Sequence, residues 1–154
     1  MHQLKRLKLV LGLLVAPMLV IGGFTVESIA AEVVMYKDPN CGCCGAWAKH
    51  MRGAGFVVKE VPRENMEAVK EKYGVSAGLA SCHTAIVDGY VIEGHVPAAD
   101  VKRLLQERPK IAGLTAPGMP MQSPGMQAEG MPPKHYSVLA FDKKGKAKVY
   151  HQYE

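Results

Sequence analysis

The sequence predicts an α/β domain in which short apolar strands alternate with amphipathic helices. Three observations predict it: apolar runs of strand length recur along the chain, apolar residues between them have helical spacing, and glycine or proline stands at most boundaries. With 154 residues, the chain is long enough for one ordinary domain. An apolar share of 48% and a charged share of 21% exclude a disordered or collagen-like chain.

The first thirty residues have the layout of a secretory signal peptide. The pattern comprises a basic start, an apolar run and a small-residue cleavage site, namely Lys5, Arg6 and Lys8, then residues 9–24, then Ser28-Ile29-Ala30. The apolar run is shorter than the roughly 20 residues of a membrane span, although an uncleaved anchor stays an alternative. We therefore expect residues 1–30 to be a signal peptide, the mature protein to be periplasmic, and no membrane association after cleavage.

Composition disfavours several classes of partner. Removing the signal segment lowers the formal net charge from +5 to +3, which weakens any argument for nucleic acid or an anionic membrane. Aromatic residues make up only 6% of the chain, so a base-stacking surface is not expected. The sequence also lacks the motifs of nucleotide-binding proteins and of serine and zinc hydrolases. These observations exclude the commonest nucleic-acid and hydrolase interpretations.

The first half of the mature chain predicts two strands and two helices. A short apolar run at 33–36 indicates a buried strand, and Asp38-Pro39-Asn40 after it is turn chemistry. A helix over 44–52 carries Trp47 and Met51 one turn apart and ends at glycine. A second strand is expected over 56–61, and an amphipathic helix over 64–73 ends at Gly74.

The next elements complete a recognisable order. Strands over 84–87 and 90–93 flank Asp88-Gly89, a strong hairpin signal. Pro97 opens a helix that Arg108-Pro109 ends. The resulting β-α-β-α-β-β-α order is thioredoxin-like, and a C-x-x-C motif between the first strand and the first helix fits that fold.

The remainder predicts a loop and an appended hairpin. Residues 113–133 are rich in Met, Pro and Gly without periodicity, and a C-terminal hairpin is expected from strands over 136–141 and 146–150. We therefore divide the chain into a signal peptide at 1–30, a thioredoxin-like core at 31–109 that holds the cysteine site, and a segment at 110–154 that packs on the core.

The stretch Cys41-Gly42-Cys43-Cys44 is the most informative part of the sequence. Simple disulfide exchange needs only Cys41 and Cys44, whereas Cys43 would compete as a partner. Adjacent thiolates suit a soft metal ion, because sulfur ligands select Cu(I), zinc or iron–sulfur centres. Two disulfides, Cys41–Cys44 and Cys43–Cys82, are the alternative for an exported protein.

Cys82 and His83 are expected to face this stretch. In a thioredoxin-like fold, the loop before the third strand faces the C-x-x-C motif, and a cis-proline usually occupies it. Here His83 precedes Thr84 instead. We therefore predict a metal site with four sulfurs and the His83 imidazole, while His95 is assigned to capping the last helix or supporting the site.

Methionines of the C-terminal loop are the last candidate ligands. Met119, Met121 and Met126 stand in an uncharged segment, and thioethers suit Cu(I) outside the cytoplasm. The alternative is that these flexible side chains fill gaps over the apolar surface of the domain.

Four motifs together resemble a known family. They are Cys41-Gly-Cys-Cys44 with Trp47 behind it, Ser81-Cys-His-Thr84, Gly89-Tyr-Val-Ile-Glu-Gly-His-Val-Pro97, and Gly118-Met-Pro-Met121 with Ser123-Pro-Gly-Met126. The combination resembles the exported bacterial CxCC proteins, a domain family of unknown function that includes the copper-resistance protein CopG. The resemblance implies a thioredoxin-like fold, copper held by Cys41, Cys43, Cys44 and Cys82 as a sulfur-bridged cluster, a role in periplasmic copper tolerance, and redox chemistry between Cu(I) and Cu(II).

The sequence thus favours a periplasmic copper-binding protein of copper resistance, in which Cu(I) is bound by the cysteines and completed or covered by His83, Met119, Met121 and Met126. Copper ions, and through them other periplasmic copper-handling proteins, are the expected partners. Two alternatives stay open: a thiol–disulfide oxidoreductase that uses Cys41 and Cys44, and a structural zinc module built on the four cysteines.

Overall fold

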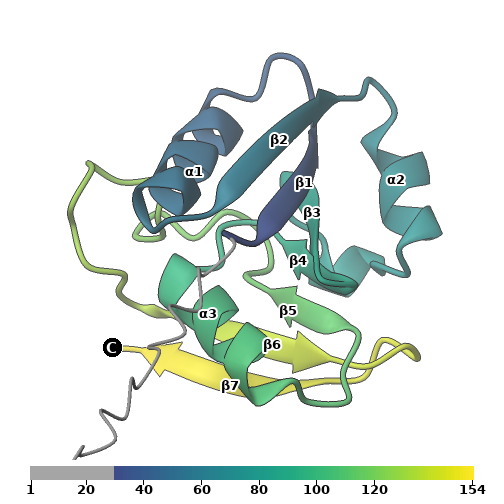
Figure 1. Cartoon of the computed structure of the whole chain (residues 1–154). Coiled ribbons are helices and arrows are strands. Elements are labelled where there is room, and N and C mark those ends of the chain that lie inside the picture. Colours follow the sequence, from purple (N-terminus) through teal and green to yellow (C-terminus); the bar gives the residue numbers. More distant parts are fainter. Residues whose placement is uncertain (1–29) are drawn as a thin grey trace, which may run out of the picture.

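The computed structural model describes residues 30–154, which form a mixed α/β fold (Figure 1). The segment interpreted as a signal peptide therefore lies, apart from Ala30, outside the described residues. The elements in chain order are β1 (Glu32–Lys37), α1 (Gly42–Gly53), β2 (Val57–Pro62), α2 (Met66–Lys72), the 3-10 helix η1 (Ala77–Leu79), β3 (His83–Val87), β4 (Tyr90–Glu93), α3 (Ala98–Glu107), β5 (Gly113–Thr115), β6 (Tyr136–Phe141) and β7 (Ala147–Tyr153).

All seven strands belong to one sheet, in the order β2-β1-β3-β4-β5-β6-β7. Strands β1 and β2 are parallel, as are β4 and β5, and the other neighbouring pairs are antiparallel. The C-terminal hairpin β6–β7 is therefore not an appendage beside the sheet but its continuation, because β5 joins β4 to β6.

Strand β5 and helix η1 were not expected from the sequence. Residues 113–115 fall in the segment that the sequence predicts as a Met-rich loop, and three residues are too few to show an alternating pattern. Gly113 permits the pairing, because a Cβ there would overlap the backbone of Val91 on β4. Pairing partners, rather than local sequence, thus decide this strand.

The helices cover both faces of the sheet. Buried side chains of α1 and α3, such as Trp47, Met51 and Leu104, pack with Met35 and Ile92 in the main core. A smaller core on the other face contains Val75 and Leu79, which follow α2. Figure 1 shows α1 and α2 on opposite sides of β1. Because side chains alternate along a strand, the three strands β3, β4 and β6 contribute to both cores.

Helix α1 begins directly at the cysteines for local reasons. Asp38 makes the preceding turn, since its carboxylate accepts from Asn40 N–H at 2.8 Å and its carbonyl accepts from Cys41 N–H at 3.1 Å. Trp47 and Met51 are both fully buried, one turn apart, and hold the helix on the sheet. The turn thus places three cysteines at the N-terminus of a helix.

The loop between β5 and β6 folds back over α1. A cavity of about 440 Å³ separates part of the loop, including Pro124 and Met131, from Lys49 and His50 of α1. Lys49 also forms an exposed ion pair with Glu129 at 2.8 Å. The Met-rich segment therefore lies beside the helix that carries the cysteines.

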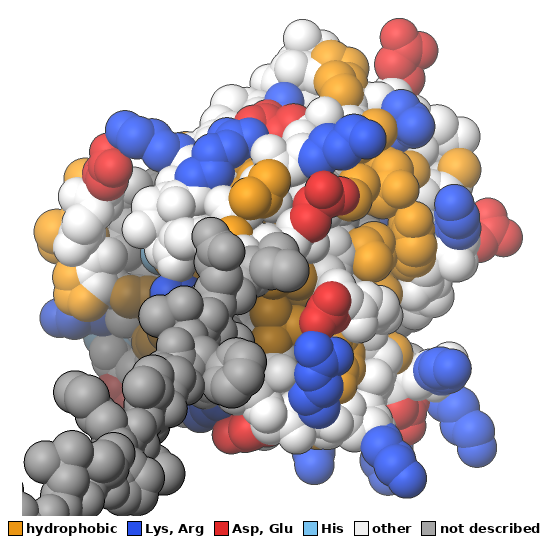
Figure 2. Space-filling view, viewed as in Figure 1, with side chains coloured by type: hydrophobic (Ala, Val, Ile, Leu, Met, Phe, Trp, Pro, Cys, Tyr) orange, Lys and Arg blue, Asp and Glu red, His pale blue; other side chains and the backbone are white. Residues whose placement is uncertain are grey.

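The surface shows no concentration of one charge on the face seen in Figure 2. Lys and Arg side chains are spread over it among Asp and Glu, with smaller hydrophobic areas between them. Within residues 30–154, no helix is long and apolar enough to cross a membrane.

Candidate metal centre

The four cysteine sulfurs lie together. Each Sγ of Cys41, Cys43, Cys44 and Cys82 is within 4.8 Å of the other three. Cys41 and Cys44 form a disulfide, whereas Cys43 and Cys82 are free thiols. Cys43 Sγ is 3.5 Å from Cys41 Sγ. Of the two disulfides considered from the sequence, the structure thus contains Cys41–Cys44 and not Cys43–Cys82.

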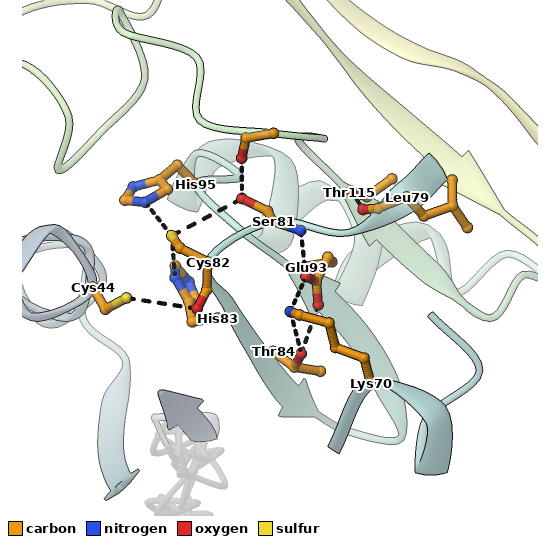
Figure 3. Close-up of polar contacts among 11 residues, drawn as sticks. Cys44, Lys70, Leu79, Ser81, Cys82, His83, Thr84, Glu93, His95 and Thr115 are labelled. Carbon is orange, nitrogen blue, oxygen red and sulfur yellow. Dashed lines mark hydrogen bonds and ion pairs between the residues drawn. The ribbon is translucent and has the colours of Figure 1, made fainter. Parts of the chain in front are cut away.

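Cys82 is also the centre of a second group of ligand atoms, with His83 and His95 (Figure 3). Cys82 Sγ lies 2.9 Å from His95 Nε2 and 3.5 Å from His83 Nδ1. One sulfur is therefore shared between a set of four sulfurs and a set of one sulfur and two imidazoles.

Both imidazoles are fully buried. Burial lowers the pKa of His83 and of His95, so both rings are neutral at neutral pH and keep a lone pair. His83 Nε2 has no hydrogen-bond partner among residues 30–154. A buried polar nitrogen without a partner lowers the stability of a fold. An ion or a small molecule bound at this nitrogen would supply the missing partner.

The loop between β5 and β6 orients His95. The ring Nδ1 lies 2.7 Å from the carbonyl oxygen of Pro124, an acceptor, so Nδ1 carries the proton and Nε2 directs its lone pair at Cys82 Sγ. Metal-binding histidines are typically fixed in this way by a backbone carbonyl. Sequence reasoning gave His95 only a capping or supporting role, and the structure places it in direct contact with Cys82.

The residue pairing of the β3–β4 hairpin, extended past its strands, would have predicted that His95 lies beside Cys82. Strands β3 and β4 pair Thr84 with Glu93. Continuing this antiparallel register two residues outward sets Cys82 opposite His95. Gly94 N–H donates to the His83 carbonyl at 2.9 Å, so the pairing does continue past the end of β4.

Gly125 allows the loop to approach this closely. Its φ is +88°, and a Cβ would lie 2.7 Å from Trp47 N and 3.1 Å from His95 Nδ1. Trp47 itself donates from Nε1 to the Val96 carbonyl at 2.8 Å. Helix α1, the loop and the residues after β4 therefore pack tightly around the centre.

The predicted methionine ligands have different positions. Met119 and Met121 are 57% and 70% exposed, and Met126 is half-buried. Met119 follows Gly118, which pairs with Ser81 in an isolated bridge, so its backbone lies beside the Cys82 segment. Met121 is further along the exposed part of the loop. Exposed thioethers remain free to turn toward an ion or toward solvent.

Burial and neighbouring groups favour the thiol form of Cys82. Burial, followed by the proximity of Cys43, raises the pKa of Cys82 to about 12. Cys44 Sγ, in the disulfide, lies 4.0 Å from the Cys82 carbonyl oxygen. A soft cation would reverse this preference, because a coordinating thiol loses its proton.

Comparison with known proteins assigns the chain to a family. Residues 79–126 match a family described as "Protein of unknown function, DUF411". The solved structure "Copper resistance protein copG- Form 2" is 40% identical over 82% of this chain and 100% of its own, with a TM-score of 0.75. The chain belongs to the CopG family.

A second CopG structure gives the same result. "Copper resistance protein copG- Form 1" is 41% identical, covers 81% of this chain and 98% of its own, and has a TM-score of 0.74. No curated protein matches the chain. The CopG relatives and the cysteine cluster together indicate a copper-related function for this chain.

Proposed function

We propose that this protein binds Cu(I) in the periplasm through Cys41, Cys43, Cys44 and Cys82, as part of copper resistance. The observation that carries the proposal is the convergence of four sulfurs within 4.8 Å of one another, next to two buried neutral imidazoles. The framework is thioredoxin-like: residues 31–109 supply the cysteines and both histidines, while residues 110–154 continue the sheet and bring the loop between β5 and β6 against His95.

The donor set fits copper better than a structural zinc site. Four sulfurs alone would satisfy tetrahedral zinc. Here Cys82 also contacts two neutral imidazoles, so it joins a group of four sulfurs to a group of one sulfur and two ring nitrogens. A sulfur shared between two sets is suited to bridging two ions, and thiolates bridge Cu(I) readily, so the set favours a multinuclear thiolate cluster.

Full coordination requires the Cys41–Cys44 disulfide to open. Adding two electrons and two protons breaks the S–S bond and gives two thiols. In the reverse direction, two thiols that close the disulfide release two electrons, which reduce two Cu(II) ions to Cu(I), and two protons. The pair therefore gives the protein a means of redox exchange with copper.

Three further parts of the proposal rest on the sequence and the relatives. The basic and apolar N-terminal segment supports export to the periplasm. His83 completes the ligand set, and Met119, Met121 and Met126 bind or cover copper at the edge of the centre. Copper ions are the primary partner, and proteins that pass copper on in the same compartment are the secondary ones.

A competition titration tests the proposal. Reduced protein comprising residues 31–154 is titrated with Cu(I) against a chromogenic Cu(I) chelator, in parallel with a variant in which Cys43 and Cys44 are replaced by Ser. We expect the wild type to take Cu(I) from the chelator and the variant to lose this ability. Equal binding by both, or no binding by the wild type, contradicts the proposal.

The disulfide itself favours a second candidate, a thiol–disulfide oxidoreductase. Cys41 and Cys44 stand at the N-terminus of α1, where free N–H groups stabilise a thiolate. An insulin-reduction assay with metal-free protein separates the two functions. Turnover that Cys41→Ser abolishes supports this candidate, and no turnover removes it.

A further inference from the structure

A buried carboxylate lies directly behind the segment that carries Cys82. Glu93, the last residue of β4, is fully buried and accepts three hydrogen bonds (Figure 3). They come from Ser81 N–H at 2.7 Å, from the Thr84 hydroxyl at 2.7 Å and from Lys70 Nζ at 2.5 Å. One carboxylate thus binds the residue before Cys82 and the residue after His83.

Glu93 is not itself in the ligand cluster. It pairs with Thr84 in the β3–β4 register, so both side chains lie on the same face of the sheet, toward Lys70 of α2. The sulfurs, in contrast, gather around α1 on the opposite face. The hydrogen bonds of Glu93 therefore reach the centre through residues 81 and 84, which flank Cys82 and His83.

The residues after Glu93 fit against the same segment. Gly94 donates to the His83 carbonyl at 2.9 Å, and a Cβ at Gly94 would overlap the Ser81 side chain. His95 then contacts Cys82. Residues 93, 94 and 95 therefore contact residues 81, 83 and 82, respectively, and fix the position of that segment.

The ion pair points to a positional role rather than to stability. Lys70 and Glu93 have side chains that are 14% and 0% exposed, and a buried ion pair stabilises a fold little better than an apolar pair of similar volume. An apolar side chain could not replace the carboxylate in one respect. The carboxylate accepts hydrogen bonds from Ser81 N–H and from the Thr84 hydroxyl at the same time.

We propose that Glu93, paired with Lys70, is a positioning residue of the metal centre, which holds Cys82 at the place where its sulfur serves both ligand sets. The proposal rests on the proposed function in that Cys82 is a copper ligand. In a fold where a cis-proline commonly shapes this loop, a polar network performs that task here.

A metal-free experiment tests the position of Cys82. With the Cys41–Cys44 disulfide closed, limiting iodoacetamide modifies Cys43 and Cys82, and peptide mass spectrometry gives both rates. The variant K70M/E93L removes the acceptor and both charges, so that no unpaired charge stays buried. We expect the ratio of Cys82 to Cys43 modification to rise about tenfold, the equivalent of one lost charge-assisted hydrogen bond.

Two further variants keep this test decisive. K70M/E93Q is also neutral but retains an acceptor for Ser81 N–H, so a smaller rise is expected. R52M/E60L makes the same exchange at the more exposed Arg52–Glu60 pair and should leave the ratio unchanged. If K70M/E93L raises both rates equally through unfolding, K70M/E93Q decides: a wild-type ratio in that variant overturns the proposal.

A copper experiment separates positioning from general stability. Cu(I) affinity is measured for K70M/E93L and for wild type, each with and without the further substitution Cys82→Ser. We expect about tenfold weaker binding where Cys82 is retained and no further loss where Cys82→Ser is already present. Equal losses in both backgrounds overturn the positioning role. Absence of Cu(I) binding by the wild type would instead contradict the proposed function, and the modification ratio would still test Glu93.

Discussion

The two halves of the candidate centre are built differently. Cys41, Cys43 and Cys44 come from four consecutive residues at the start of α1, and one turn of chain places their sulfurs together. Cys82 and His83 stand at the start of β3, and His95 follows the end of β4, so the three meet at the open end of the β3–β4 hairpin. The Pro124 carbonyl of a distant loop orients His95. The local half needs only a helix to start at the right residue, whereas the assembled half needs the sheet, the loop and Glu93.

This difference has a consequence for mutations. Changes in the local half should remove ligands and leave the fold intact, because its geometry is fixed by neighbouring residues. Changes in the assembled half should alter both affinity and stability, because the same contacts position the ligands and pack the core. The following predictions, in order of decreasing effect, test this contrast.

Removing Cys82 should have the largest effect, since this sulfur belongs to both ligand sets. We expect Cys82→Ser to weaken Cu(I) binding by at least about a hundredfold, the upper range for losing a partner that merely supports a ligand. Chelator competition measures the affinity, with Cys43→Ser as the matched control in the local half. A loss for Cys82→Ser no larger than for Cys43→Ser would contradict the shared role.

Gly125→Ala, in the loop between β5 and β6, should displace that loop from His95 and so alter the assembled half. The added Cβ meets Trp47 and His95 at a φ of +88°, so we expect a destabilisation of about 2–4 kcal/mol. Gly130→Ala is the matched control, because its φ of +82° is similar and nothing lies within 4 Å of a Cβ there. Its expected loss is about 1 kcal/mol.

Urea unfolding measures both glycine variants, and Cu(I) titration should show weaker binding only for Gly125→Ala. Equal stability losses in the two variants would show that the loop adapts and that the fit over His95 is not required.

Trp47→Phe should have a smaller effect. It leaves the buried Val96 carbonyl without its 2.8 Å donor, which costs about 1–3 kcal/mol. Tyr90→Phe also removes a donor to a carbonyl, that of Pro109, away from the centre. Thermal unfolding should show a loss in both, and weaker Cu(I) binding only in Trp47→Phe. Unchanged Cu(I) binding in Trp47→Phe would mean that this link does not position the histidine side.

The smallest expected effect is a pH dependence at His50. Burial lowers its pKa below 6.5, and its Nε2 accepts from Ala98 N–H at 3.1 Å at the start of α3. As pH falls below 6.5, the unfolded chain binds a proton that the folded ring resists, so stability decreases. We expect His50→Gln to lose less stability than wild type between pH 7 and pH 5. Parallel curves would show that His50 is not involved.

Local sequence was sufficient for most elements of the fold. The apolar runs, the Asp88-Gly89 turn and the helix-ending glycines predicted strands β1 to β4 and helices α1 to α3, with differences of a few residues at their ends. The sequence did not predict strand β5, because its three residues become a strand only through pairing with β4 and β6. The same pairing turned the expected appended hairpin into part of one sheet.

For the candidate centre, the sequence predicted that the four cysteines lie together. It did not predict the contact of His95 with Cys82 or the hydrogen bonds of Glu93 behind it. The position of Cys82 near the other cysteines followed from the expected order of elements. His95 was undervalued because its role depends on the exact register of a hairpin and on a carbonyl 29 residues away. The sequence predicts Glu93 as the end of a strand but indicates no role for it, since a single carboxylate at that position has no local signature.

The sequence by itself determined the chemistry of this protein: three cysteines within four residues, a fourth beside a histidine, and a loop of soft methionines. Residue type and close spacing fix which ions these groups prefer, and no folding is needed to read that preference. Only the tertiary structure decided which imidazoles meet the sulfurs, which tautomer His95 adopts and what holds Cys82 in place. These depend on register and packing between segments far apart in the chain, and the energies involved are those of contacts that exist only after folding.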